Sequence, residues 1–278
     1  MDIVAIIVSA LMAIVAPTGV LLDSVAADAL RRQVAGVDDL AVRIDNVPNY
    51  QVINGRIDHV RVAARGVYPR QLPTLRIAAI DLETDPVAVD VGALQRGQLQ
   101  LNTPAQAALR LRLQASDINT FLASPQVQTW LDTLRFSLPG EIGERERERY
   151  GLANPTLEFL AGDRLRLVVD LEDRVLADTI PIVLETGVAV MNGHRFELIQ
   201  PRLEIEGELA PPELVTTFAD GASREFSLRR LEDWGLTSRI LTFHVRDNEL
   251  DIALFARLEP DSPFLQRQTE AQAVPPAP

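Results

Sequence analysis

The sequence contains no cysteine, which excludes disulfides and thiolate metal sites. It also contains no lysine, so all 27 basic residues are arginines. Without lysine, Schiff-base chemistry and a P-loop lysine are excluded as well. Only 5% of the residues are aromatic, and three are histidine. Few residue types are therefore left from which the usual nucleophilic or metal-dependent active sites are built.

Positive charge is in deficit. The formal net charge is −12, and a body this acidic is repelled by phosphate backbones and by anionic membrane surfaces unless its arginines cluster on one face. We therefore expect no nucleic-acid partner. The hydrophobic share is 47% over 278 residues, which is enough for one large or two small domains with a real core and excludes a disordered chain.

Sequence motifs of catalysis are also missing. No nucleophile elbow, Walker loop, dinucleotide-binding glycine motif or zinc-protease motif occurs. His59, His194 and His244 lie far apart in the sequence, with no carboxylate or histidine at a metal-ligand spacing. We predict a protein that is not an enzyme and has no catalytic residues, metal or cofactor. A lipid or glycan hydrolase stays an alternative, and it requires a histidine and a carboxylate to converge in space.

What the sequence does have begins with an apolar run. Residues 3–22 carry no charge, and a helix of 20 residues spans about 30 Å, the hydrocarbon thickness of a bilayer. A signal anchor, a cleaved signal peptide and a buried core helix all remain open. A signal peptide normally begins with positive charge, whereas this run follows Asp2. Arg31 and Arg32 on its C-terminal side leave the topology undecided.

The periodicity then changes along the chain. Helical spacing between residues 22 and 37 predicts an amphipathic helix that ends near Gly36, and a period of two follows from residue 40. A break in parity near Asp58 predicts a bulge or bend. Further strands are predicted at residues 57–65, 75–79, 87–91 and 109–115. Helical spacing returns at residues 116–134, with Ser116 and Ser124 as N-caps.

The second half is again rich in strands. Alternation predicts strands at residues 157–159, 165–171, 182–190, 196–198 and 203–205, and a last hairpin of residues 241–245 and 250–254 with its turn at Asp247-Asn248. Asn192-Gly193 is the strongest hairpin signal. Helical segments are predicted from Pro211 and around residues 226–234. The charge run at residues 141–151 is typical of a solvated loop or short exposed helix. Short connections predict antiparallel pairing in an α+β fold, with one or two sheets left open.

The apolar faces admit two interpretations. They pack as an ordinary core, or they enclose a cavity for acyl chains, because such a cavity is a core left partly unfilled. Burial contributes about 0.8 kcal/mol per methylene, so a 16-carbon chain offers roughly 12 kcal/mol before ordering costs. Several predicted strands carry arginines that alternate with apolar residues, such as Arg61, Arg110, Arg112 and Arg166. This alternation favours a solvent-exposed sheet face over a site in which the arginines bind an anionic headgroup.

The sequence contains the four stretches DSVAADALRRQVAG, NVPNYQVINGRIDHVRVAARGV, LRIAAIDLETDPVAVDV and LRLRLQASDINTFLASP. Together they resemble the LmeA-like phospholipid-binding proteins, bacterial envelope proteins related to the tubular lipid-binding (TULIP) superfamily. The resemblance is best over residues 22–135 and looser to about 258. It departs from the family in its acid-led N-terminus and in the charge run, which resembles an insertion.

The resemblance implies a strongly curved antiparallel sheet wrapped around a long helix, in one elongated TULIP-like domain. It implies an apolar tunnel that binds or transfers phospholipid at or near a membrane. We expect residues 1–22 to be a membrane anchor or signal-like segment, residues 23–258 the lipid-binding domain and residues 259–278 a disordered tail. The expected location is the cell envelope or periplasm rather than the cytoplasm. A membrane-tethered protein-interaction scaffold without a lipid cavity is the alternative.

Periodicity and the resemblance together predict which side chains line the apolar interior. Most lie on strands, and two lie on the helix expected inside the sheet. The predicted lining residues are Val42, Ile44, Val60, Val62, Leu109, Leu111, Leu113, Phe196, Leu198, Phe243 and Leu254 on strands, with Trp130 and Leu134 on the enclosed helix.

Overall fold

The protein is an α+β domain made mostly of antiparallel strands with a few helices, as predicted. The computed structural model describes residues 27–28, 30–32, 34–46, 51, 54–95, 100–133, 150–225, 227–246, 248–263 and 265. The charge run and the apolar residues 3–22 lie outside these described residues, and so does most of the predicted tail. The division of the chain into anchor, lipid-binding domain and tail therefore stays a prediction.

Two large sheets and one small one answer the question that periodicity left open. The first sheet has the order β1 (Val34–Asp45), β3 (His59–Pro69), β4 (Ile77–Thr84), β6 (Ala105–Gln114), β13 (Glu249–Leu258) and β12 (Leu236–Arg246). The second has the order β11 (Glu208–Leu209), β10 (Arg195–Ile205), β9 (Asp178–Met191), β8 (Arg164–Asp173) and β7 (Tyr150–Leu160). β2 (Arg56–Ile57) pairs with β5 (Val87–Ala88).

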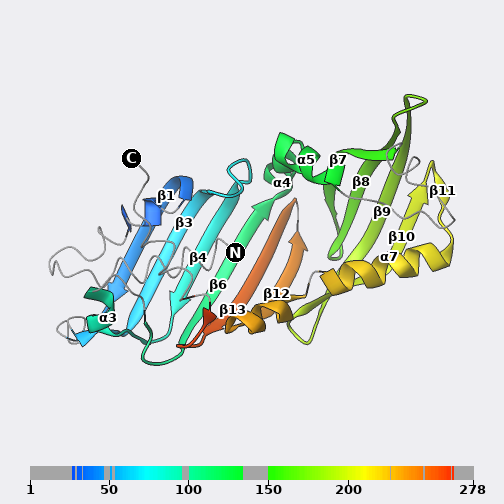
Figure 1. Cartoon of the computed structure of the whole chain (residues 1–278). Helices are drawn as coiled ribbons and strands as arrows, with labels where there is room; N and C mark the ends of the chain where they lie inside the picture. The colour runs from blue at the N-terminus through cyan, green and yellow to red at the C-terminus, as the bar shows by residue number, and fades with distance from the viewer. Residues whose placement is uncertain are drawn as a thin grey trace.

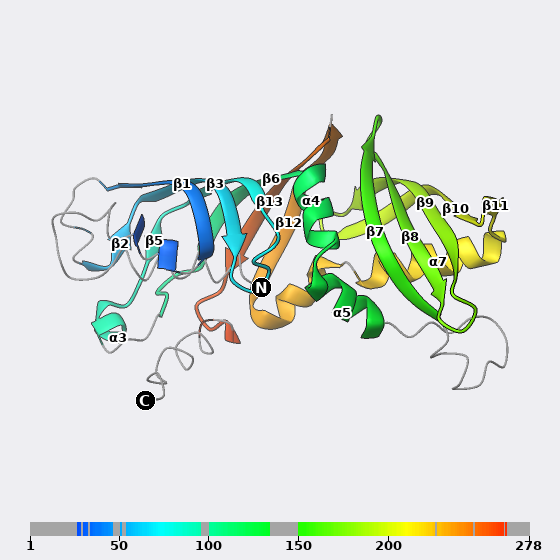
Figure 2. The ribbon, with the colours of Figure 1, turned by 90° about the horizontal axis from the view of Figure 1, so that it is seen from above.

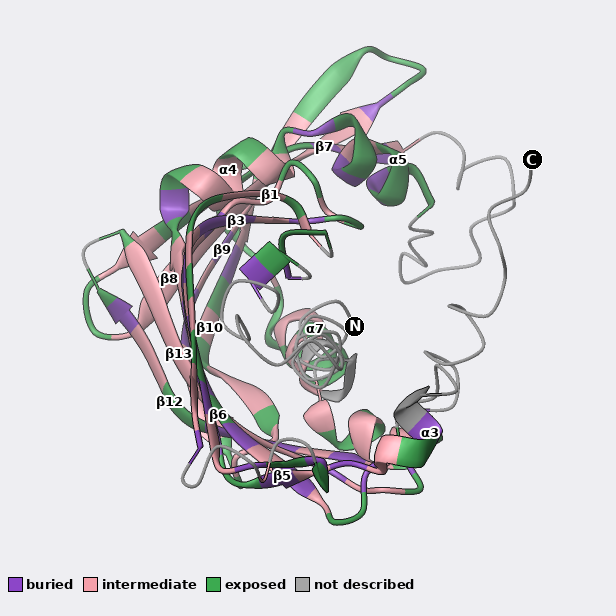
Figure 3. Ribbon diagram, turned by 90° about the vertical axis from the view of Figure 1, so that its left-hand side faces the viewer, coloured by how far each residue is buried: buried purple, intermediate pink, exposed green. Residues whose placement is uncertain are grey.

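The two large sheets lie side by side and form one elongated structure (Figure 1). The helices α4 (Ala115–Leu122) and α5 (Pro125–Thr133) lie between them, and α7 (Pro212–Glu225) runs beside β10 (Figures 1 and 2). Seen along the long axis, the strands follow an open curve and do not close into a barrel (Figure 3). The predicted strong curvature is thus present.

The long enclosed helix is not confirmed. Helix is described at residues 27–28 and 30–32, and β1 already begins at Val34, so the prediction that this helix continues to Gly36 is wrong. The physical reason is pairing: Val34 and Val37 lie opposite Pro69 and Val67 of β3, and β-branched valines fit a pleated surface better than a helix. Leu30 on the short helical piece is buried.

Two other predicted elements need correction. The helical stretch at residues 116–134 is two helices: the first ends at Leu122 with Ala123 as its C-cap, and the second begins at Pro125. Ser124 precedes the second helix, and its Oγ accepts a hydrogen bond from Val127 N. Ser124 is thus confirmed as a cap, whereas Gln114 rather than Ser116 takes the cap position of α4. The strand predicted at residues 87–91 is only two residues long, and α3 (Val91–Gln95) follows it.

The predicted hairpin and bend are confirmed. Asn192 and Gly193 both have positive φ angles, 53° and 69°, as a tight turn between β9 and β10 requires. The parity break at Asp58 is a bend between β2 and β3. The helix predicted from Pro211 is α7, and the segment after it is the 3₁₀ helix η2 (Leu228–Trp234).

Hairpin turns of the second sheet cover the edge strand β12 of the first. Ile240 N donates to Gly193 O at 2.6 Å, and Val245 N donates to Asp163 Oδ1 at 2.7 Å. These bonds satisfy backbone groups that an exposed edge strand would otherwise offer to another chain. The edge strand β7 is covered in a similar way, because the Asn119 side chain exchanges two hydrogen bonds with the backbone of Leu157.

Ion pairs cross the polar face of the first sheet. Arg110 donates two hydrogen bonds to Asp251 on the adjacent β13, at 2.8 and 2.5 Å. These bonds hold the pKa of Asp251 below its ordinary value, although partial burial opposes the shift. The pKa of Glu83 is lowered in the same direction, first by hydrogen bonding from His59 and then by Arg61.

A lowered carboxylate pKa makes stability depend on acid pH. Asp251 binds its proton more weakly in the folded state, so its contribution is complete above its unfolded pKa and is lost as pH falls through the folded value. We expect the melting temperature to fall between about pH 5 and pH 2, and Asp251→Asn to flatten part of that fall. Thermal melts across this range measure the effect. Asp39→Asn, at an exposed residue without an ion pair among the described residues, serves as the control. Identical slopes for Asp251→Asn and the parent would contradict the prediction.

Candidate functional site

Aliphatic side chains form continuous rows across all six strands of the first sheet. Antiparallel pairing places directly opposed residues on the same face, so each row is a chain of neighbours. The face that carries the rows is called the inner face here, and the opposite one the outer face. One row is Val42, Val62, Leu82, Leu109, Leu254 and Ile240, and the next is Leu40, Ala64, Ile80, Leu111, Ile252 and Phe243.

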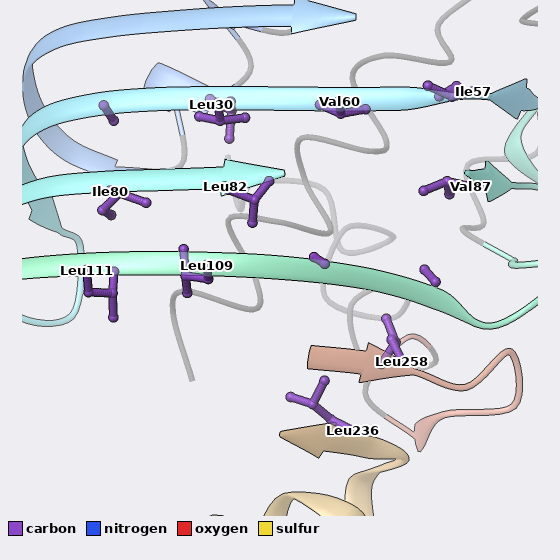
Figure 4. Close-up of a cluster of buried hydrophobic side chains, with 14 of the residues drawn as sticks. Leu30, Ile57, Val60, Ile80, Leu82, Val87, Leu109, Leu111, Leu236 and Leu258 are labelled. Carbon is purple, nitrogen blue, oxygen red and sulfur yellow. The ribbon is translucent and has the colours of Figure 1, made fainter. Parts of the chain in front are cut away.

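Burial along these rows is uneven. Val62, Leu82 and Leu109 at the centre are 6–7% exposed and belong to one hydrophobic cluster with Leu30 (Figure 4). The strand β13 differs: it lies between β6 and β12, yet all of its residues except Leu258 are only half-buried. An internal strand of a fully packed sheet buries its apolar face, so the inner face over β13 is incompletely covered.

The second sheet repeats this arrangement. Leu157, Leu167, Leu184 and Leu203 form a row across four strands. Leu184 and Leu203 are buried, whereas every residue of the internal strand β8 before Asp173 is half-buried. The apolar residues Leu165, Leu167, Val169 and Leu171 of β8 therefore line a second incompletely covered surface.

An aromatic pair joins the two apolar surfaces. The rings of Phe196 on β10 and Phe243 on β12 meet edge to face, with centroids 5.4 Å apart and planes at 68°. Phe243 belongs to an inner-face row of the first sheet, and Phe196 lies opposite Val190 in the second. This contact connects the apolar surface of the first sheet with that of the second, where β12 and β10 approach each other.

Most of the predicted lining residues come together on this surface. Val60, Val62, Leu109 and Leu111 are buried in its centre, and Val42, Ile44, Leu113 and Leu254 pack at its margin. Phe196, Phe243 and Leu198 lie at the junction of the sheets or next to it. Trp130 is not confirmed on an enclosed helix, because it lies on α5 and is 57% exposed. Leu134 lies outside the described residues.

Periodicity missed Ile80 and Leu82, two central residues of the inner face. The predicted strand at residues 75–79 followed Ile77 and Ala79, which are buried but have the opposite parity. The start of β4 is buried on both faces, so its apolar run does not reveal which parity faces inward. The alternation of Ile80, Leu82 and Thr84 with Asp81 and Glu83 is the signal that identifies the inner parity.

The outer face carries charge, and its arginines are largely neutralised. The guanidinium of Arg61 lies 3.0 Å from the carboxylate of Glu83 and 3.3 Å from that of Asp45. Arg110 forms an ion pair with Asp251. In the second sheet, the guanidinium of Arg166 lies within 3.2 Å of the carboxylates of Glu158 and Glu185. Arg112 is half-buried, with an Nε atom that has no hydrogen-bond partner among the described residues. Alternation favoured a solvent-exposed sheet face for these arginines. The structure shows such a face at Arg61, Arg110 and Arg166.

Two hollows accompany these surfaces. One, of about 370 Å³, lies over the first sheet and is lined by charged residues such as Arg61 and Arg110 and by small ones such as Ala63 and Ala253. The other, of about 290 Å³, lies between β10 and α7, where Arg195, Glu197 and Asp220 contribute its polar lining. The second borders Leu198 of the apolar surface.

Two histidines do meet carboxylates. His59 Nε2 lies 2.6 Å from Glu83 Oε1, and His244 Nδ1 lies 3.6 Å from Asp163 Oδ1. Both rings are 31–44% exposed, and within the described part of the chain neither has a serine or threonine hydroxyl as a hydrogen-bond partner. A nucleophile activated by a base needs that contact, so neither pair is part of a Ser-His-carboxylate triad among the described residues.

Metal-ligand clusters and membrane-spanning helices are both missing from the described residues. No three His, Asp or Glu side chains there gather as metal ligands. Among the helices of the described ranges, none has the length and apolar character needed to cross a bilayer.

The similarity of the chain to known proteins bears directly on this apolar surface. No curated protein matches the chain, and no solved structure does. The sequence does match the LmeA-like phospholipid-binding family over residues 16–255, a range that contains both large sheets almost entirely. The resemblance noted in the sequence is thus confirmed over most of the chain. By this match, the chain belongs to the LmeA-like phospholipid-binding family.

Proposed function

We propose that the inner face of the first sheet and the face of the second sheet that carries the Leu167–Leu184 row hold the acyl chains of a phospholipid, which the protein binds or transfers without chemical change. One observation carries this proposal: β13 and β8 leave their aliphatic residues half-buried, although each lies between two paired strands. An ordinary core would cover these residues. Family membership supplies the ligand class, phospholipid.

The energetics favour acyl chains over smaller ligands. Each methylene that leaves water contributes about 0.8 kcal/mol, so a long chain offsets the ordering cost of binding without any dedicated polar contact. A row of leucines and valines supplies such contacts along its whole length. The ion-paired outer-face arginines do not take part, and the polar hollow between β10 and α7 provides a place for a headgroup beside Leu198.

The proposed setting is a membrane of the cell envelope. The apolar residues 3–22 would tether the chain there, so that the domain works close to the bilayer from which its ligand comes. Cleavage of that segment would instead release the domain. Mass measurement of the mature protein from its native host distinguishes a retained segment from a cleaved one.

Native mass spectrometry of gently purified protein tests lipid binding directly. We expect an adduct of phospholipid mass that disappears after delipidation and returns when lipid is added back. A clean apo mass in several preparations, with no adduct after addition of a soluble short-chain phosphatidylcholine, would count decisively against the proposal.

Adjacent residues on opposite faces provide matched variants. Leu254 lies on the inner face and Ala253 on the outer one, and Leu198 and Ile199 are related in the same way on β10. We expect Leu254→Glu and Leu198→Glu to reduce lipid binding about tenfold or more, because a carboxylate in an acyl site must be desolvated. Ala253→Glu and Ile199→Glu should bind as the parent does. Circular dichroism confirms that each variant is folded, and equal losses in both sets would overturn the assignment of faces.

A further inference from the structure

The hairpin between β8 and β9 exposes two neighbouring aliphatic side chains. Val175 is 73% exposed and Leu176 is 68% exposed, more than any other large hydrophobic residue in the described part of the chain. The hairpin extends beyond the rest of the second sheet (Figures 1 and 3). Exposing such a pair at a protruding tip is unfavourable in water.

The tip is held rigidly in this exposed arrangement. Asp173 is only 5% exposed, and its Oδ1 accepts hydrogen bonds from Val175 N at 2.9 Å and Leu176 N at 3.1 Å. Ala177 adopts a positive φ of 53°, which a non-glycine residue rarely does. The turn is therefore built to present these two side chains outward.

An ion pair between Arg174 and Asp132 holds the hairpin against α5. Arg174 Nη2 donates to Asp132 Oδ1 on α5 at 2.7 Å. The guanidinium passes over the backbone of Gly151, where a Cβ atom would lie only 2.7 Å from Nη2. The Arg174 side chain is thus bound to the domain, whereas Val175 and Leu176 are exposed.

The tip continues directly into the proposed acyl-chain site. Leu171 and Ile180 are the first opposed apolar pair below the turn, followed by Val169 with Ile182 and Leu167 with Leu184. All three residues of β8 in this ladder are half-buried. An acyl chain that reaches Val175 and Leu176 meets an unbroken aliphatic path inward.

We propose that Val175 and Leu176 insert into the surface of a phospholipid bilayer and admit lipid to the inner face along the β8–β9 ladder. This inference rests on the proposed function, because only a lipid-binding site gives the ladder a ligand. We expect the tip to bind the apolar interior of the bilayer and not the charge of its headgroups. Asp178 beside the tip is exposed and negative, and Arg174 is already paired with Asp132. Zwitterionic vesicles should therefore suffice.

The absence of cysteine makes insertion directly measurable. Leu176→Cys in the full chain introduces a single thiol, which is labelled with an environment-sensitive fluorophore. On addition of phosphatidylcholine vesicles we expect a blue shift, and quenching by brominated lipid about tenfold stronger than for the same label at Leu209→Cys. Leu209 is 64% exposed on β11, at another hairpin. Equal quenching at both positions would overturn the proposal.

Lipid uptake provides a second measurement. Val175→Ser with Leu176→Ser should slow uptake of labelled phosphatidylcholine from vesicles about tenfold, because the tip no longer gains free energy from insertion. Leu209→Ser and Leu241→Ser, which remove equally exposed leucines, should take up lipid at the parent rate. Uptake by the double variant at the parent rate would overturn the proposal.

A soluble ligand separates this inference from the proposed function. Short-chain phosphatidylcholine below its micelle concentration needs no bilayer, so the double variant should bind it as the parent does. Loss of that binding in the double variant would show that the tip belongs to the site rather than to a bilayer contact. Absence of binding in the parent would instead overturn the proposed function, while the fluorophore still reports whether the tip inserts.

Discussion

Replacing Gly66 with alanine is expected to lower the free energy of unfolding by about 3 kcal/mol. Gly66 in β3 has a φ of +58°, where a side chain costs about 1–2 kcal/mol. A Cβ atom there would also lie 1.8 Å from Asp38 Oδ2. The carboxylate would have to move, which breaks its ion pair with Arg76 at 2.9 Å.

Gly207 supplies the matched control for this prediction. It has a φ of +78°, and no atom lies within 4 Å of the position that a Cβ atom would take, so Gly207→Ala should cost only the backbone term, about 1 kcal/mol. Adding Asp38→Ala to Gly66→Ala should recover part of the loss, because the clash is then removed. Urea denaturation measures all three variants. Equal losses for the two glycine variants would show that Asp38 gives way freely.

Leu109→Ala is expected to cost about 3 kcal/mol, and Leu254→Ala about 1 kcal/mol, in the delipidated protein. The two leucines lie directly opposite each other on β6 and β13, on the same face. Leu109 is 6% exposed and would leave a cavity, whereas Leu254 is half-buried and has fewer neighbours to lose.

This pair tests the central structural claim about the inner face. Denaturant unfolding gives both values, and lipid should stabilise the parent more than it stabilises Leu254→Ala. If the two truncations cost the same free energy without lipid, Leu254 is packed as tightly as Leu109. The inner face over β13 would then be ordinary core, with no surface left for an acyl chain.

Local chemistry was enough to predict many of the elements. Alternation at residues 109–115 and 165–171 predicted strands with one apolar face, because a strand turns successive side chains to opposite sides. Asn192-Gly193 predicted its hairpin because both residues tolerate positive φ. For the same reason, alternation predicted that Val60 and Val62 share one face and that Leu109 and Leu111 do, and all four are buried.

Local chemistry failed where long-range pairing decides. Val34 and Val37 have the spacing of a helical apolar stripe in the sequence. They belong to a strand because they pair with β3, which the sequence around them does not reveal. The start of β4 is buried on both faces, so Ile77 and Ala79 looked like the inner-facing residues of this strand. The residues that do face inward, Ile80 and Leu82, were therefore not predicted. Trp130 has helical spacing but lies on a short helix outside any enclosure.

The sequence by itself determined the strand-rich antiparallel class, the face of most strands and the family, because periodicity and motifs are local properties of the chain. Only the tertiary structure decided that there are two large sheets, that Phe196 contacts Phe243, and that β8 and β13 are internal yet half-buried. Those features depend on contacts between residues far apart in the chain. Whether an apolar face is covered is a property of what packs on it, and no local pattern records that.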